Sequence, residues 1–74
     1  MGRKQTDSEL SKRAGREMIR LYGSVEKAAQ ETGLTKSPIY SWLLGAHTPD
    51  AWALKKMAEH GADVHYILTG ERHG

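Results

Sequence analysis

The segment from Ser24 to Leu44 reads SVEKAAQETGLTKSPIYSWLL, and the expected fold is organised around it. Both halves of this segment carry apolar residues at helical spacing, with Gly33 between them. Glycine adopts the left-handed backbone conformation that ends a helix and reverses the chain without steric cost. The segment therefore predicts two short helices joined by a tight turn, the helix-turn-helix arrangement.

Single positions in the segment fit two helices that cross. A side chain larger than the methyl group of Ala29 would push the helices apart where they approach each other. Leu34, Ile39 and Trp42 recur at the spacing that places them on one side of the second helix, so we expect them to face the core. The opposite side of this helix is left free. It carries Thr35, Lys36, Ser37, Tyr40 and Ser41.

Upstream of the segment another helix is expected, which starts after a cap at Thr6 or Ser8 and is closed by Gly23. Its apolar stripe at helical spacing consists of Leu10, Ala14, Met18 and Leu21. Gly15 lies in the middle of this helix, where glycine costs about 1 kcal/mol relative to alanine. The glycine therefore indicates either close packing against a neighbouring element or simple tolerance.

Downstream, two further helices are expected, and the five expected helices are closed in order by Gly23, Gly33, Gly45, Gly61 and Gly70. Residues that we expect the first downstream helix to bury are Ala51, Leu54, Met57 and Ala58. The apolar residues of the second downstream helix are Val64, Ile67 and Leu68. No stretch shows the alternation of a β-strand. The sequence thus predicts an all-α, compact five-helix domain over residues 8–70, between a flexible arm (1–7) and a flexible tail (71–74).

Capping residues mark where the five expected helices begin. Ser, Thr and Asp side chains accept hydrogen bonds from the free N–H groups at a helix start, and a Glu three residues later completes a capping box. Pro49 suits the first position of a helix capped by Thr48. The expected N-caps are Thr6 (or, as an alternative, Ser8), Ser24, Thr35, Thr48 and Asp63.

Composition limits the classes of function. Seventy-four residues make one domain with a small core, and the absence of cysteine excludes disulfides and thiolate metal sites. The net charge of +2 is uneven, because the chain up to Leu44 has eight Lys and Arg against five Asp and Glu, a net +3, and the remainder has a net −1. A basic N-terminal half suits a polyanionic partner, although a solvated helix surface has the same composition.

Catalytic and metal-binding arrangements are not found in the sequence. The four histidines form no H-x-x-x-H pair, and no Ser-His-acid set, paired carboxylates or phosphate loop is present. The chain is too short to enclose a substrate pocket. The N-terminal MGRKQTDSE has no apolar signal region, and the apolar runs are too short to span a membrane. We therefore expect no enzyme, metal, cofactor, small-molecule ligand or membrane association.

These residues resemble a known family, the small lambda-type phage repressors and Cro proteins with their related bacterial regulators. The resemblance covers about residues 8 to 70. It includes AAQETGLTKSPIYSWLLG and the run P-x-x-x-x-L-x-x-M-A-x-x-G-A-D-V-x-Y-I-L-T-G that begins at Pro49. The resemblance implies a lambda-repressor-like fold and a Cro-type transcriptional repressor that binds double-stranded operator DNA as a homodimer. It also implies a location in the cytoplasm or nucleoid of a bacterial host.

The second helix of the pair is the one that such proteins place in the major groove, where each base pair shows a distinct pattern of donors and acceptors. The positions that match the family's base readers are Lys36, Ser37 and Ser41, with Thr35 and Tyr40 at the flank. Lys36 could donate to guanine O6 and N7, a contact worth about 1 to 3 kcal/mol of discrimination. Phosphate contact and simple solvation are the alternatives for this lysine.

The chain departs from the family where phosphates are bound. Val25 stands where the family often has glutamine, and Ala46-His47-Thr48 replaces basic residues that commonly follow the reading helix. Phosphate contacts are therefore expected from Ser24, Lys27 and His47, and from Arg3 and Lys4 if the leader is more than a solvated terminus. Few phosphates would be neutralised by one such module, which favours a dimer. The expected dimer interface consists of Trp52, Tyr66 and Ile67, for which burial in the core is the alternative.

Two other interpretations are compatible with the sequence. The chain could be the N-terminal DNA-binding domain of a longer phage repressor. It could also be a helical protein-interaction module, such as an antitoxin or an adaptor. Partner proteins are usually met with an apolar or aromatic anchor cluster, whereas the free face predicted here is mostly polar.

Overall fold

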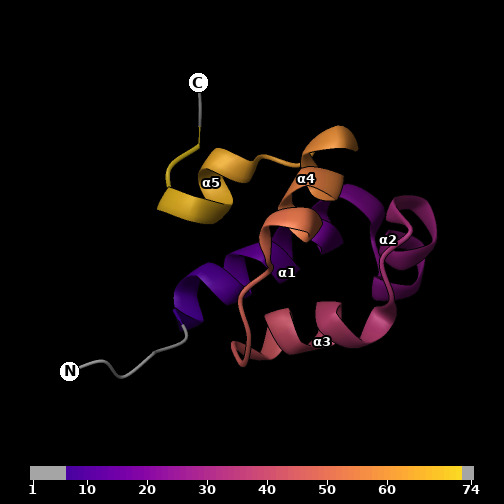
Figure 1. Cartoon of the computed structure of the whole chain (residues 1–74), viewed down its shortest axis with the longest axis horizontal. Helices are drawn as coiled ribbons and strands as arrows, with labels where there is room; N and C mark the ends of the chain where they lie inside the picture. The colour runs from indigo at the N-terminus through magenta and orange to yellow at the C-terminus, as the bar shows by residue number, and fades with distance from the viewer. Residues whose placement is uncertain (1–6, 73–74) are drawn as a thin grey trace.

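The computed structural model describes residues 7–72, and within them the chain forms five helices and no strand. The helices are α1 (Ser8–Tyr22), α2 (Val25–Thr32), α3 (Lys36–Leu44), α4 (Ala51–Glu59) and α5 (Val64–Thr69). The long helix α1 lies at the centre, and α2, α3 and α5 all pack against it (Figure 1). This architecture confirms the all-α, five-helix part of the predicted fold.

The helix starts differ from the predicted caps at two places. Helix α1 is capped by Asp7, whose Oδ1 accepts a hydrogen bond from the Leu10 N–H at 3.1 Å, and not by Ser8; Thr6 lies outside the described residues. Helix α4 is capped by Asp50, whose Oδ1 accepts from the Ala53 N–H at 2.8 Å, so the predicted cap at Thr48 is wrong. In both places a carboxylate replaces a hydroxyl, and its negative charge is favourable at the positive end of a helix.

The predicted caps at Ser24 and Asp63 are confirmed, since each side chain accepts a hydrogen bond from the N–H three residues on. Thr35 occupies the cap position of α3, but its side chain makes no capping hydrogen bond. Four helices end at the predicted glycines, namely Gly23, Gly33, Gly45 and Gly70. Helix α4 ends at His60, one residue before the predicted Gly61.

The core lies where α1 meets α3, and it requires glycine at position 15. A Cβ atom added to Gly15 would lie 2.7 Å from the Leu43 Cδ2 atom and 2.8 Å from the Leu43 backbone nitrogen. Gly15 therefore marks close packing, the first of its two predicted explanations. The fully or almost fully buried apolar residues of the core are Ala14, Met18, Val25, Ala28, Leu34, Ile39, Trp42, Ala53, Met57 and Ile67.

The buried face of two helices differs from the prediction. In α4, Ala53 and Met57 are buried, while Ala51 and Ala58 are exposed. Alanines occur on more than one side of α4, so their spacing does not define its inner face. In α1, Ala14 and Met18 are buried as expected, but Leu10 and Leu21 are only half-buried. Two polar residues, Ser11 and Glu17, are completely buried beside them.

Ser11 on α1 forms hydrogen bonds that hold the end of α3 against α1. Its hydroxyl group donates to the Trp42 carbonyl at 2.9 Å and also contacts the His47 carbonyl oxygen. The Trp42 carbonyl, near the end of α3, also accepts a hydrogen bond from the Gly45 N–H, and the His47 carbonyl belongs to the connection that follows α3. A hydroxyl on α1 thus fixes the chain at the point where it leaves α3 for α4.

Glu17 fastens α5 and the following segment to α1. Its carboxylate accepts hydrogen bonds from Arg20 Nε at 3.0 Å, from the Asp63 N–H at 2.8 Å and from Arg72 Nη2 at 3.0 Å. Burial alone would raise the pKa of Glu17, but these hydrogen bonds and the charge of Arg20 outweigh it and lower the pKa to about 2. Glu17 is therefore ionised over the physiological pH range, and it holds together three parts of the chain.

Candidate nucleic-acid interface

The candidate interface begins with the exposed side of α3. Lys36, Ser37 and Tyr40 are exposed and Ser41 is half-buried, while Ile39 and Trp42 point into the core from the opposite side. Burial of these two apolar side chains fixes the rotation of α3, because residues three positions apart lie on the same side of a helix. The structure thus places the predicted base-contacting residues on one accessible face, with Thr35 exposed just before the helix.

Helix α3 also presents an apolar residue that the sequence analysis did not assign to this face. Leu44 is 77% exposed, the largest value among the exposed large apolar side chains. It follows Tyr40 and Ser41 at helical spacing, which is the signal that could have identified it. The face is therefore polar at the N-terminal end of α3 and apolar at its C-terminal end.

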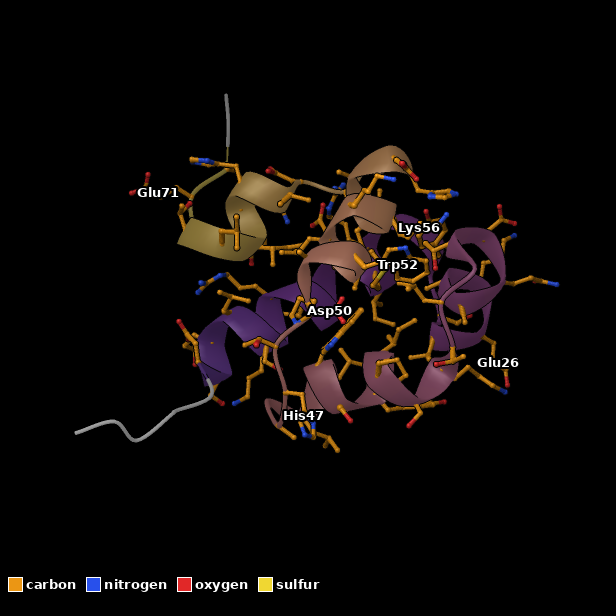
Figure 2. All side chains as sticks on the ribbon, viewed as in Figure 1. Glu26, His47, Asp50, Trp52, Lys56 and Glu71 are labelled. Atoms are coloured by element: carbon orange, nitrogen blue, oxygen red, sulfur yellow. The ribbon has the colours of Figure 1, made fainter. Side chains whose placement is uncertain are left out.

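A groove of about 580 Å³ runs between α3 and the start of α4. Its polar lining includes Ser37, Ser41 and His47, and Trp52 forms part of its wall. Figure 2 shows His47 in the α3–α4 connection and Trp52 on α4 above α3. The Trp52 side chain is 56% exposed, and the Lys56 ammonium lies 5.5 Å from its ring centroid. His47 and Trp52 thus adjoin the α3 face.

At the N-terminal end of α3, the start of α2 adds charged and polar groups. Ser24 and Lys27 are both exposed, and the Ser24 hydroxyl accepts a hydrogen bond from the Lys27 N–H at 3.1 Å. Lys36 forms an ion pair with Glu26, with 3.8 Å between Nζ and Oε2. Sequence reasoning missed this pair, because its two residues are ten positions apart on different helices. Of the predicted phosphate contacts, Arg3 and Lys4 lie outside the described residues.

The three predicted dimer residues do not form one exposed patch. Ile67 is completely buried, so its assignment to a dimer surface was wrong and it belongs to the core. Tyr66 is half-buried, with the Arg72 guanidinium 3.9 Å from its ring centroid. Trp52 is exposed, but it lines the groove beside α3. Leu68, which the sequence analysis counted among the apolar residues of this helix, is 47% exposed.

Within residues 7–72, no three His, Asp or Glu side chains come together in a way that could hold a metal ion. None of the helices in the described part of the chain is long and apolar enough to cross a membrane. Comparisons with protein-family models, with curated proteins and with solved structures find no match to this chain. The fold and the face together define a small all-α domain that presents to solvent a helix surface with a polar and an apolar end.

Proposed function

We propose that this chain is a sequence-specific regulator of transcription that binds double-stranded DNA through a lambda-repressor-like helix-turn-helix, with α2 and α3 as its two helices. The observation that carries the proposal is the exposed face of α3. Lys36, Ser37 and Ser41 offer hydrogen-bonding groups there, while the other side of the helix is fixed in the core. An α-helix fits the major groove of B-DNA, and such side chains can then reach base edges.

Groups that could bind phosphates lie near both ends of α3. The first turn of α2, which carries Lys27 and whose Glu26 pairs with Lys36, lies by the N-terminal end of α3, and His47 follows its C-terminal end. The free N–H groups and the dipole at a helix N-terminus favour an anion. Phosphate contacts near both ends of α3 would orient it in the groove, which is the role that backbone contacts have in DNA recognition.

The regulator is proposed to act as a homodimer on two half-sites about 34 Å apart, as a Cro-type repressor that excludes polymerase from its operator. A single copy with a net charge of +2 neutralises few phosphates, so a second copy supplies the missing affinity. With Ile67 in the core, the accessible apolar groups of α5 are Leu68 and parts of Val64 and Tyr66. These residues of α5 are the proposed dimer contact in place of the predicted set Trp52, Tyr66 and Ile67. Trp52 lies instead beside the proposed DNA-binding face.

A protein-interaction module is the second candidate, and one observation favours it. Leu44, Tyr40 and Trp52 are 77%, 51% and 56% exposed, and aromatic and apolar anchors are typical of protein interfaces. An N-terminal domain of a longer repressor would use α3 in the same way as the main proposal. The exposed apolar residues alone favour the protein-binding candidate, whereas the polar residues at the start of α3 favour DNA.

Changing Lys36→Ala is expected to weaken binding to the preferred DNA site by about 10- to 100-fold, because one lysine–guanine contact is lost. The preference for guanine at one position should fall with it. Binding of short duplexes that carry each base at that position measures both effects. Lys55→Ala is the matched control, since Lys55 is an exposed lysine on α4 with an ion pair to Glu59. If the preference for guanine is unchanged in the Lys36→Ala variant, Lys36 of α3 does not recognise that base.

A further inference from the structure

One ion pair connects the two helices of the proposed DNA-binding face. Glu26 lies in the first turn of α2 and Lys36 is the first residue of α3, with 3.8 Å between Nζ and Oε2. The side chains are 78% and 56% exposed, so both are accessible to a ligand. They lie at a surface groove that Ala29, Gln30, Leu34 and Thr35 complete. Among residues 7–72, Glu26 is the only carboxylate within ion-pair distance of Lys36.

This pair affects the charge with which α3 meets DNA. Lys36 is the only basic residue of α3, which has no acidic residue of its own. A lysine ammonium is a mobile point charge with three donors, and a free one would bind any phosphate within reach. Phosphate contacts add affinity that does not depend on the sequence. A carboxylate beside the ammonium attracts it and repels phosphates, so it reduces this sequence-independent contribution.

We propose that Glu26 is a specificity-determining residue, which acts by holding Lys36. The inference rests on the proposed function. Where a guanine lies within reach, Lys36 donates to its O6 or N7 and keeps another donor on Glu26. On other sequences the ammonium stays paired, and the Glu26 charge opposes the nearest phosphate. The pair thus lowers affinity for unrelated DNA more than for the preferred site, and a repulsive group of this kind is a known route to specificity.

The variant Glu26→Gln tests the inference, because it preserves side-chain size and removes the charge. Affinity for random-sequence duplex DNA is expected to rise about fivefold, and the logarithmic salt dependence to steepen by about one counterion. Affinity for the preferred site should rise less, so the ratio of specific to non-specific affinity is expected to fall about threefold. Titrations of both duplexes at several salt concentrations measure these quantities.

Two controls separate a specific role of Glu26 from a general effect of charge. Glu31→Gln removes the same charge from the same helix, but Glu31 lies near α1, where burial and then the charge of Glu31 raise the pKa of Tyr22. This variant is expected to leave the specificity ratio unchanged. In a Lys36→Met background, Glu26→Gln should also leave the ratio unchanged, since simple repulsion acts on all DNA alike. An equal fall of the ratio in that background would contradict a role through Lys36.

The outcomes distinguish this inference from the function on which it rests. If the unaltered protein binds all duplexes alike, the proposed function and the inference both fall. If it prefers one site and Glu26→Gln keeps the full specificity ratio, the inference alone is overturned. A lowered ratio that requires both Glu26 and Lys36 is the result that supports it.

Discussion

Replacement of the buried carboxylate by Glu17→Gln is expected to lower the free energy of unfolding by about 2 to 3 kcal/mol, because hydrogen bonds to a charged group are worth about that much. Glutamine keeps the shape of the side chain but places an NH₂ group among donors from Arg20, Arg72 and the Asp63 N–H. A chain of this length has a total stability of about 4 to 11 kcal/mol. We therefore expect the midpoint of thermal unfolding to fall by about 10 to 20 °C.

The matched control is Glu59→Gln. Glu59 also faces two basic groups, Lys55 at 3.4 Å and Lys56 at 3.9 Å, but its side chain is 47% exposed. Exposed ion pairs contribute about 1 kcal/mol or less, so this variant should change the midpoint little. Thermal and urea unfolding of both variants measure the difference. Equal effects of the two substitutions would contradict the role assigned to the buried carboxylate.

The same carboxylate gives stability a defined pH dependence. The pKa of Glu17 is about 2 in the folded chain against 4.5 for the free group. The folded chain therefore binds a proton at Glu17 less readily than the unfolded chain does. The contribution of Glu17 to the free energy of unfolding is fully present above pH 4.5 and is lost as the pH falls toward about 2. The gap in unfolding free energy between the unaltered protein and Glu17→Gln should narrow over that range. Urea unfolding at pH 7, 4 and 3 measures it, and a gap that widens on acidification would contradict the assignment.

Gly15→Ala is expected to lower the free energy of unfolding by about 2 kcal/mol, although alanine is the better helix former by about 1 kcal/mol. The sign is decided by the Leu43 backbone nitrogen, which would lie only 2.8 Å from the new Cβ. Backbone atoms cannot turn aside as the end of a side chain can, so α1 and α3 would have to move apart. Urea unfolding of the variant measures the change.

Leu43→Ala in the Gly15→Ala background separates the two parts of this clash. It removes the Leu43 Cγ and Cδ2 atoms, each 2.7 Å from the new Cβ, and leaves the backbone nitrogen in place. The double variant should therefore lose less stability than the sum of the two single changes, since residues in direct contact are not additive. A Gly15→Ala protein more stable than the unaltered chain would show that glycine is merely tolerated at this position.

The sequence predicted the features that are determined by residues close together in the chain. The spacing of Ile39 and Trp42 placed the outer face of α3, and glycines placed the ends of four helices. The buried side of α4 was not predictable in this way, because its alanines suit more than one face. The caps at Asp7 and Asp50 were missed because neighbouring threonines and serine are also good caps.

Features that depend on distant partners could not be predicted from local patterns. No neighbouring residue marks Glu17 for burial, because its partners Asp63 and Arg72 lie 46 and 55 residues further along the chain. Ser11 is buried for the same reason, since it contacts a carbonyl of α3 and one of the connection that follows it. At the candidate interface, the ion pair between Glu26 and Lys36 also arises only when two helices come together. The spacing of residues in the sequence thus identified the exposed face of α3, whereas the ion pair on that face results from tertiary packing.

Selection from a library of random duplex DNA tests the central proposal most directly. Purified protein is mixed with the library at two salt concentrations, and the bound duplexes are sequenced. The proposed function predicts one enriched site with two-fold symmetry, half-sites about one helical turn apart and a guanine whose enrichment is lost with Lys36→Ala. Binding without any enriched sequence, abolished by the higher salt, would contradict it and leave the exposed Leu44, Tyr40 and Trp52 as a surface for a protein partner.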